Sequence, residues 1–475
     1  MTFCTPEFLI FLVIVLGLYW LLPRRPQNLL LCLASFVFYG WWDWRFLFLL
    51  IFAAGVDFVA ARKMAATENP ATRKALLFAS LAINLGTLGF FKYYNFFVDS
   101  GYAVLHALGV QGTPPLLRLI LPVGISFYTF QALSYTIDVY RRRMHVVYDP
   151  VQYFGFITFF PQLVAGPIER ASNLVDQFGE ERRFDFSQAA DGLRQMLWGF
   201  FKKMVVADNL ASIVSAAYDH PADSSGWVLI WATYAFAFQI YCDFSGYTDV
   251  AIGCARLFGF RLMRNFAYPY FSQDIREFWR RWHISLSTWF RDYLYIPLGG
   301  NRVSTWLTYR NIMIVFIVSG FWHGANWTFV IWGFLHGVFF LLLPAASASV
   351  SPDDAPGGEG LLPAPRTLLR MLWTFHLVWF AWIFFRAADA GQAFQIIAKI
   401  ARAPWEGGFV LPPKIMMACI ASLVVVEWLG RASQHALQEI ELWPRPLRWA
   451  AYYGAVAVIL IAAQLNYVPF IYFQF

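Results

Sequence analysis

The sequence has few charged residues. Only 14% of its 475 residues are Asp, Glu, Lys or Arg, while 59% are hydrophobic and 20% are aromatic. A typical soluble domain carries roughly 25% charged residues. A soluble protein of this composition could not cover itself with polar surface, so the scarcity of charge excludes that class and indicates a protein embedded in a lipid bilayer.

Several motifs of well-known enzyme classes are also missing. The chain has no G-x-S-x-G nucleophile elbow, no G-x-x-x-x-G-K-[ST] phosphate loop and no H-E-x-x-H zinc motif. These absences disfavour a serine hydrolase, an ATPase and a zinc protease. The five cysteines are scattered without C-x-x-C spacing, so we expect neither a disulfide framework nor a metal site (Cys4, Cys32, Cys242, Cys254 and Cys419).

Apolar runs of the length needed to cross a bilayer recur along the whole chain. A spanning helix needs about 20 mainly apolar residues. We predict a single all-α membrane domain over 1–475, a bundle of about 11 spans with re-entrant and interfacial helices, in which 345–366 is a flexible polar loop. The candidate segments are 6–22, 28–44, 46–61, 75–97, 116–139, 190–218, 227–257, 306–323, 326–344, 367–386, 413–430 and 448–467.

Basic residues fall in every second loop between these runs. Arg24 and Arg25 follow the first run, 62–63 and 73–74 follow the third, and 141–143 follow the fifth. Because positive loops stay in the cytoplasm, this pattern predicts an N-terminus outside and basic loops inside. It also accounts for the net charge of +7 without nucleic acid, which we do not expect as a partner.

The segment 264–304 alternates tryptophans with arginines. One interpretation is an anchor helix at the membrane surface, with its rings among the headgroups and its guanidiniums in water. The other is a cationic rim for an anionic substrate, made by Arg280, Arg281 and Arg291. From its local context alone, His283 is predicted to be an interfacial surface histidine.

Two further histidines, His323 and His336, lie inside an apolar run and are flanked by glycines. A polar side chain at bilayer depth costs a few kcal/mol unless it is partnered or lines a wet cavity. The run therefore predicts a functional site, with a histidine that only packs helices as the alternative. On one straight helix the two side chains would point to different sides, so the sequence does not predict a shared site.

The motifs around these histidines are similar to those of a known family. Trp282 to Trp289 and Phe321 to Trp327 resemble the membrane-bound O-acyltransferase (MBOAT) family, and within it the bacterial alginate O-acetylation branch. Similarity extends over nearly the whole chain, through 124–131, 159–168, 241–249, 381–386 and 469–475. The resemblance implies the MBOAT fold and an O-acyltransferase, with His323 as the central catalytic histidine and His283 as the second polar residue of the site. His336, Asn326 and Trp282 are the expected supporting residues.

The resemblance also implies a reaction. Acetyl-CoA from the cytoplasm would be the donor substrate, with no bound cofactor and no metal, and Arg280, Arg281 and Arg291 would bind its phosphates. His323 would act as general base or be acetylated itself. His283 would orient the imidazole of His323 or stabilise the developing oxyanion.

The resemblance leaves the acceptor of the acyl group more open than the donor. The resemblance implies a multi-pass protein of the bacterial inner membrane, with periplasmic acetyl-accepting partners and, indirectly, an exported polysaccharide such as alginate. D-alanyl or other acyl transfer to a different cell-envelope acceptor stays open, because the teichoic acid branch shares the motifs. A membrane transporter of the acyl donor is the main non-enzyme alternative, although no internal repeat supports it. A scaffold for a polysaccharide machine would leave the Trp-His-Gly motif without chemical purpose.

Overall fold

The computed structural model describes residues 1–164, 166–343, 351–358, 360–406, 408–463 and 470–471. Every regular element in these ranges is a helix, as the composition predicted. The chain divides into two compact units, Met1–Ala189 with Ala255–Leu262, and Ala190–Cys254 with Met263–Phe475. The single membrane domain stays a prediction, and the two units are treated separately below.

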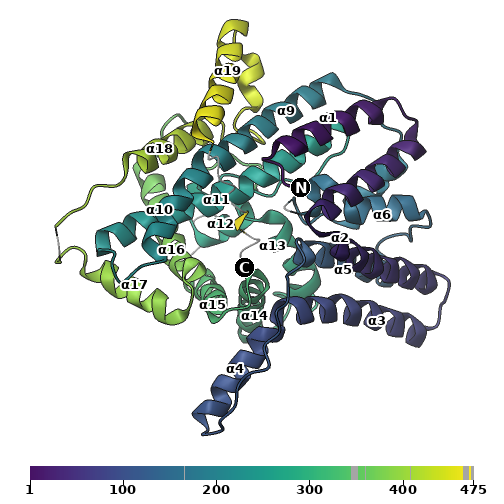
Figure 1. Cartoon of the computed structure of the whole chain (residues 1–475), viewed down its shortest axis with the longest axis horizontal. Helices are drawn as coiled ribbons and strands as arrows, with labels where there is room; N and C mark the ends of the chain where they lie inside the picture. The colour runs from purple at the N-terminus through teal and green to yellow at the C-terminus, as the bar shows by residue number, and fades with distance from the viewer. Residues whose placement is uncertain (165, 344–350, 359, 407, 464–469, 472–475) are drawn as a thin grey trace. The chain divides into compact units, whose positions relative to one another are not determined.

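The first unit is organised around one long helix, α2, which packs against α1, α3, α5 and α6 (Figure 1). This helix bends at Asp43 (φ −159°, ψ 110°), where two of the predicted spans meet. The elements are α1 Pro6–Trp20, α2 Arg24–Ala65, α3 Pro70–Leu88, the π-helix η1 Gly89–Tyr93, α4 Tyr94–Ala107, α5 Ile125–Tyr140, α6 Pro150–Thr158, α7 Phe160–Leu163 and α8 Ala171–Gly179.

The predicted span 116–139 is wrong in its first part, because α5 begins only at Ile125. Pro122 disfavours a helical residue before it, and Gly124 adopts a left-handed φ of +74°. A Cβ on Gly124 would lie 2.8 Å from the carbonyl oxygen of Leu163. Backbone geometry and close packing therefore stop the helix where hydrophobicity alone would continue it.

The second unit contains the histidine motifs. Helices α9 Phe186–Phe200 and α11 Gly226–Leu257 have residues in both units. The other elements are η2 Phe201–Ala207, α10 Asp208–Tyr218, η3 Pro269–Phe271, α12 Ile275–Arg281, α13 Ile284–Phe290, η4 Arg291–Tyr295, α14 Thr305–His323, α15 Trp327–Leu342, α16 Pro365–Arg386, α17 Ala390–Arg402, α18 Lys414–Leu429, η5 Gln438–Leu442 and α19 Arg445–Ala462.

Helices α14 and α15 form a close hairpin (Figure 1). A Cβ on Gly320 would lie 2.2 Å from the carbonyl oxygen of Phe329, and a Cβ on Gly333 would lie 2.3 Å from that of Phe316. Small residues let the backbones of membrane helices approach in this way. The two glycines therefore fix how α14 and α15 lie against each other.

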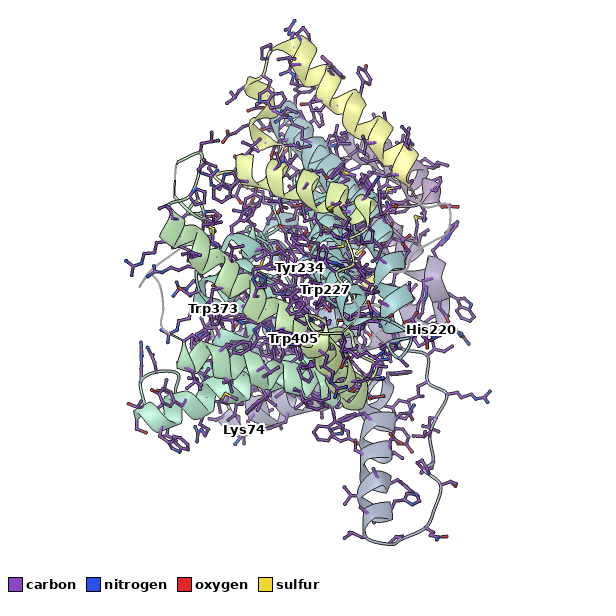
Figure 2. All side chains as sticks on the ribbon, turned by 90° about the vertical axis from the view of Figure 1, so that its left-hand side faces the viewer. Lys74, His220, Trp227, Tyr234, Trp373 and Trp405 are labelled. Atoms are coloured by element: carbon purple, nitrogen blue, oxygen red, sulfur yellow. The ribbon has the colours of Figure 1, made fainter. Side chains whose placement is uncertain are left out.

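The outer surface is rich in apolar side chains. Trp373 and Trp405 are 63% and 86% exposed (Figure 2), and α1 exposes Leu9, Ile10 and Val13. Within the described part of the chain, three helical stretches are long and apolar enough to cross a membrane: Arg24–Ala65, Pro70–Ala107 and Pro365–Arg386. These features agree with a membrane protein. The count of about 11 spans stays a prediction. Of the predicted loop 345–366, residues 345–350 and 359 lie outside the described residues.

Candidate active site

His283 lies at a sharp break in the chain. It separates α12 from α13 and adopts a left-handed backbone conformation, φ 46° and ψ 53°. Such a conformation is strained for a residue with a side chain, and strain of this kind is concentrated at functional sites. The break explains why the Trp/Arg segment forms two seven-residue helices rather than one surface helix.

The His283 side chain is completely buried, so the prediction of an interfacial surface histidine is wrong. Its Nδ1 lies 3.2 Å from Oδ1 of Asn265, which also accepts the backbone N–H of Ser285 at 3.2 Å. Because that oxygen can only accept, Nδ1 carries the proton and Nε2 carries the lone pair. Burial lowers the pKa of His283 to about 3, which keeps the imidazole neutral.

His323 is the last residue of α14, and the three residues after it form a tight connection to α15. A Cβ on Gly324 would lie 2.0 Å from the ring of Phe329, so only glycine fits there. Asn326 caps α15 by accepting the N–H of Thr328 at 3.0 Å, and its Nδ2 donates to the carbonyl oxygen of Ala388 at 2.7 Å. Asn326 therefore supports the site through the backbone.

The three histidines share one aromatic cluster. The ring centroids of His283 and His323 lie 6.3 Å apart, and the ring of Trp332 lies 5.2 Å from His323 and 4.8 Å from His336. The different directions expected on a straight helix do not apply, because the chain reverses between α14 and α15. Trp282 belongs to the same cluster, with its centroid 5.2 Å from that of Trp382, which stacks on Trp332.

His336 presents a buried N–H donor. Trp279 donates its indole N–H to Nδ1 of His336 over 3.3 Å, so the neutral ring carries its proton on Nε2. Within the described ranges, neither Nε2 of His336 nor Nε1 of Trp332 has a hydrogen-bond partner, although both side chains are fully buried. A buried donor without an acceptor is costly, so two of them on adjacent rings of one cluster point to an oxygen acceptor that binds there.

A cavity of about 490 Å³ lies next to this cluster. Its lining brings together Arg280 and Arg291, two of the three predicted donor-binding residues, and adds Arg276. Trp279, which donates to His336, forms part of the same wall. Trp279 therefore contacts both the arginine-lined cavity and the histidine cluster.

Arg281 does not line this cavity. Its side chain is 1% exposed, and its Nε donates to Oε1 of Glu277 over 2.9 Å. The prediction of a guanidinium in water is therefore wrong for Arg281, because the partner one helical turn earlier draws it into the interior. No cluster of three or more His, Cys, Asp and Glu side chains that could hold a metal ion occurs among the residues described.

The C-terminal residues Phe470 and Ile471 support His283 from the other side. The backbone N–H of Ile471 donates to Oδ2 of Asp243 over 2.6 Å, and the ring of Phe470 lies 5.9 Å from that of Phe244. Phe244 in turn packs edge-on against His283, with 4.7 Å between centroids. The rest of the terminal motif, 469 and 472–475, lies outside the described residues.

Sequence reasoning missed several residues of the site. Asn265 precedes His283 by 18 positions, and no spacing rule links an asparagine to a histidine across that distance. Trp332 and Trp279 are two of 21 tryptophans, so neither stood out by residue type. Arg276 lies in the same arginine-rich stretch as Arg280, and that clustering was the only signal for it.

Comparison with known proteins agrees with this geometry. Residues 140–351, which contain all three histidines, match the membrane-bound O-acyltransferase family. A protein named probable alginate O-acetylase AlgI from Azotobacter vinelandii is 43% identical over 84% of this chain and 78% of its own. A peptidoglycan O-acetyltransferase from Helicobacter pylori is 36% identical over 83% and 79%, respectively. A teichoic acid D-alanyltransferase from Streptococcus thermophilus is 29% identical over 58% and 70%.

The buried histidine cluster, the helical fold and these similarities define a membrane-bound acyl-transfer enzyme. The chain belongs to the membrane-bound O-acyltransferase family. It is an O-acyltransferase, and the relatives with the higher identities are named for transfer of acetyl groups.

Proposed function

We propose that this enzyme transfers an acetyl group from cytoplasmic acetyl-CoA to a hydroxyl on the other side of the bacterial inner membrane, for O-acetylation of an exported polysaccharide such as alginate. The observation that carries the proposal is the contact between the arginine-lined cavity and the histidine cluster through Trp279. A cationic cavity suits the phosphates of the donor, and a neutral buried histidine suits proton transfer.

The donor phosphates would bind to Arg276, Arg280 and Arg291. Arginine presents a planar fork of donors that matches phosphate oxygens, and each of these side chains lines the cavity. The buried pairing of Arg281 with Glu277 favours a structural role for that residue instead. The acetyl-bearing arm would then extend along Trp279 towards His323.

His323 would act as the general base. It would take the proton of the acceptor hydroxyl as the hydroxyl oxygen attacks the thioester carbonyl. The carbon–sulfur bond then breaks, and the CoA thiolate takes up that proton and leaves as the thiol. In the alternative order, His323 is acetylated first and the hydroxyl attacks the acetyl-imidazole. Both orders consume one thioester and yield one ester and one thiol.

The buried N–H groups of Trp332 and His336 would stabilise the tetrahedral intermediate. The thioester oxygen gains negative charge there, and fixed donors in a dry site stabilise such a charge strongly. Trp332 lies beside His323, and His336 lies beside Trp332; neither N–H has an acceptor within the described ranges. His283, held by Asn265, would orient the His323 imidazole or the acceptor.

The relatives support acetylation of a cell-envelope polymer. Two of them are named for acetyl transfer, to alginate and to peptidoglycan. Transfer of D-alanine is the second candidate, because a teichoic acid D-alanyltransferase is also similar over more than half of the chain. Periplasmic proteins that accept the acetyl group would be the partners, and the N-terminus would lie outside.

The decisive experiment measures thiol release from acetyl-CoA by the purified protein in nanodiscs. We expect His323→Ala to abolish release, and His106→Ala, which changes an exposed histidine of the first unit, to leave it intact. Equal release by wild type and His323→Ala would contradict the catalytic role. Release from a D-alanyl carrier-protein thioester but not from acetyl-CoA would favour the second candidate.

A further inference from the structure

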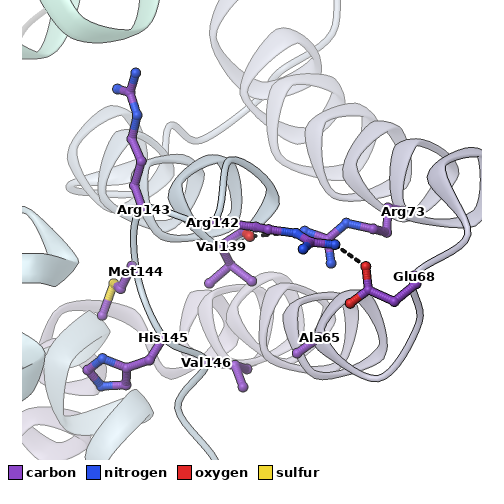
Figure 3. Close-up of a pocket in the computed structure, with 9 residues that line it drawn as sticks. All are labelled: Ala65, Glu68, Arg73, Val139, Arg142, Arg143, Met144, His145 and Val146. Carbon is purple, nitrogen blue, oxygen red and sulfur yellow. Dashed lines mark hydrogen bonds and ion pairs between the residues drawn. The ribbon is translucent and has the colours of Figure 1, made fainter.

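A basic pocket lies in the first unit, where α2, α3 and α5 end or begin (Figure 3). It has a volume of about 440 Å³. Its lining carries one carboxylate, Glu68, against four groups that can be cationic: Arg73, Arg142, Arg143 and His145. None of these residues has a part in the acyl-transfer mechanism proposed above.

Arg73 supplies a buried positive charge. Its side chain is nine-tenths buried, and its Nη2 donates to the carbonyl oxygens of Val139 at 3.3 Å and Tyr140 at 3.0 Å. Its Nη1 donates to the carbonyl oxygen of Met64. These are last-turn carbonyls of α5 and α2, so the guanidinium holds two helix ends together. No carboxylate in the described part of the chain pairs with Arg73 or with Arg143, which leaves the pocket with excess positive charge.

Arg142 is held in a strained conformation. It follows the end of α5 with a left-handed φ of 57°, in the position that glycine usually takes after a helix. Its ion pair with Glu68 joins two side chains that are 62% and 80% exposed, and such surface pairs contribute little to stability. The ion pair therefore does not account for an arginine here, and a strained residue beside a charged pocket points to a function.

The pocket lies at the end of a membrane-crossing helix, next to the lipid headgroups. The part of α2 beyond the bend at Asp43 ends at Ala65, in the pocket wall. About 20 helical residues cross the hydrocarbon core, so this end of α2 reaches the depth of the lipid phosphates. Arg62, Lys63 and Lys74 are exposed around the same helix ends, and basic clusters in this position attract anionic lipids.

We propose that this pocket binds the phosphate group of an anionic membrane lipid. Arg142 and Arg143 bind the phosphate oxygens, and Arg73 contributes a fixed charge beneath them. Phosphate is also carried by soluble ions, but the pocket lies at the end of a membrane-crossing helix, which places lipid phosphates next to it at high local concentration. The proposal does not depend on the acyl-transfer mechanism.

The test compares two double variants that remove the same charge. Lipid binding to the purified full-length protein is measured by native mass spectrometry with phosphatidylglycerol, and with phosphatidylcholine as the neutral reference. We expect Arg142→Ser with Arg143→Ser to weaken phosphatidylglycerol binding about tenfold. Lys63→Ser with Lys74→Ser lies at the same helix ends outside the pocket and should weaken it much less. Equal weakening in both would overturn the proposal, because it would show attraction to charge alone.

A third variant separates binding from folding. Arg142→Gly removes the guanidinium and relieves the left-handed strain, so we expect weaker phosphatidylglycerol binding with an unchanged or raised melting temperature. Unchanged lipid binding in this folded variant would also overturn the proposal. Finally, millimolar inorganic phosphate is added to the wild type. If inorganic phosphate raised the melting temperature and phosphatidylglycerol bound no better than phosphatidylcholine, the pocket would bind a soluble ion. That result would overturn the proposal of a lipid phosphate.

Discussion

At the scale of single residues, the site is defined by what surrounds each imidazole. His323 and His283 both have aromatic neighbours, and His283 is also held by the polar pair Asn265 and Ser285. The aromatic side chains exclude water, and the amide of Asn265 selects which nitrogen of His283 carries the proton. These contacts agree with the different roles proposed for the two histidines.

Trp332→Phe tests the indole N–H with little change in ring packing. We expect kcat to fall about a hundredfold with little change in KM, because the lost donor acts on the developing charge. Steady-state kinetics with acetyl-CoA measures both constants. Trp373→Phe, which alters an exposed tryptophan (Figure 2), is the matched control and should keep wild-type kinetics. A wild-type kcat in Trp332→Phe would remove the indole from the mechanism.

Asn265 is a positioning residue, and two substitutions separate its effects. Asn265→Ala removes the acceptor for Nδ1–H of His283, and we expect kcat to fall about tenfold or more. Asn265→Asp keeps an acceptor but adds a negative charge, which raises the pKa of His283 from its lowered value of about 3. If neutral His283 is required, the acid limb of the pH–rate profile moves to higher pH in Asn265→Asp. An unshifted limb would show that the protonation of His283 does not limit the reaction.

At the scale of helices, packing determines how closely two helices approach each other more than hydrophobicity does. Gly320 lets α14 approach α15 closely, and a Cβ there would lie 2.2 Å from a carbonyl oxygen. Gly17 on α1 has no atom within 4 Å of its Cβ position. The same residue type therefore has opposite consequences in the two helices.

Gly320→Ala should lower the melting temperature and reduce thiol release, because α14 and α15 must separate to admit the methyl group. The cost is about 1–3 kcal/mol. Gly17→Ala should be neutral or stabilising by up to about 1 kcal/mol, since alanine favours the helix. Thermal unfolding in detergent compares the two, and equal effects would contradict the importance of the close contact.

The helices themselves were largely predictable, but their breaks were not. The runs at 28–44 and 46–61 were predicted correctly as apolar helices, because composition alone decides them. The surface helix expected around Trp279 and Trp289 failed because the left-handed turn at His283 depends on Asn265, a contact across 18 positions. Local periodicity does not contain that information. His323 and His336 were predicted from their place in an apolar run, and the role of His283 from the resemblance, whereas the indole donors needed the tertiary structure.

At the scale of the whole molecule, the proposed reaction depends on where the positive charges lie. The proposed donor-binding residues lie in the second unit, and the effect of substituting them should appear in KM. We expect Arg276→Ser to raise the KM for acetyl-CoA about tenfold with a smaller change in kcat, because a guanidinium–phosphate contact is lost. Arg281→Ser should instead lower thermal stability, since it leaves Glu277 buried without its partner. An unchanged KM in Arg276→Ser would exclude it from the donor site.

The orientation predicted from the basic loops can be measured directly. In a cysteine-free background, Lys74→Cys should react with a membrane-impermeant maleimide only after the cells are permeabilised. Asp99→Cys, at an exposed position of α4 in a stretch poor in lysine and arginine, should react in intact spheroplasts. The reverse pattern would invert the predicted topology.

The hairpin of α14 and α15 also limits how this sequence can change. The turn between His323 and Trp327 sets the rotation of α15, and each residue of an α-helix turns it by about 100°. One inserted or deleted residue in that turn would therefore carry Trp332 and His336 away from His323, even if every side chain were kept. The geometry of the site therefore depends on the length of the turn as much as on the identity of its histidines.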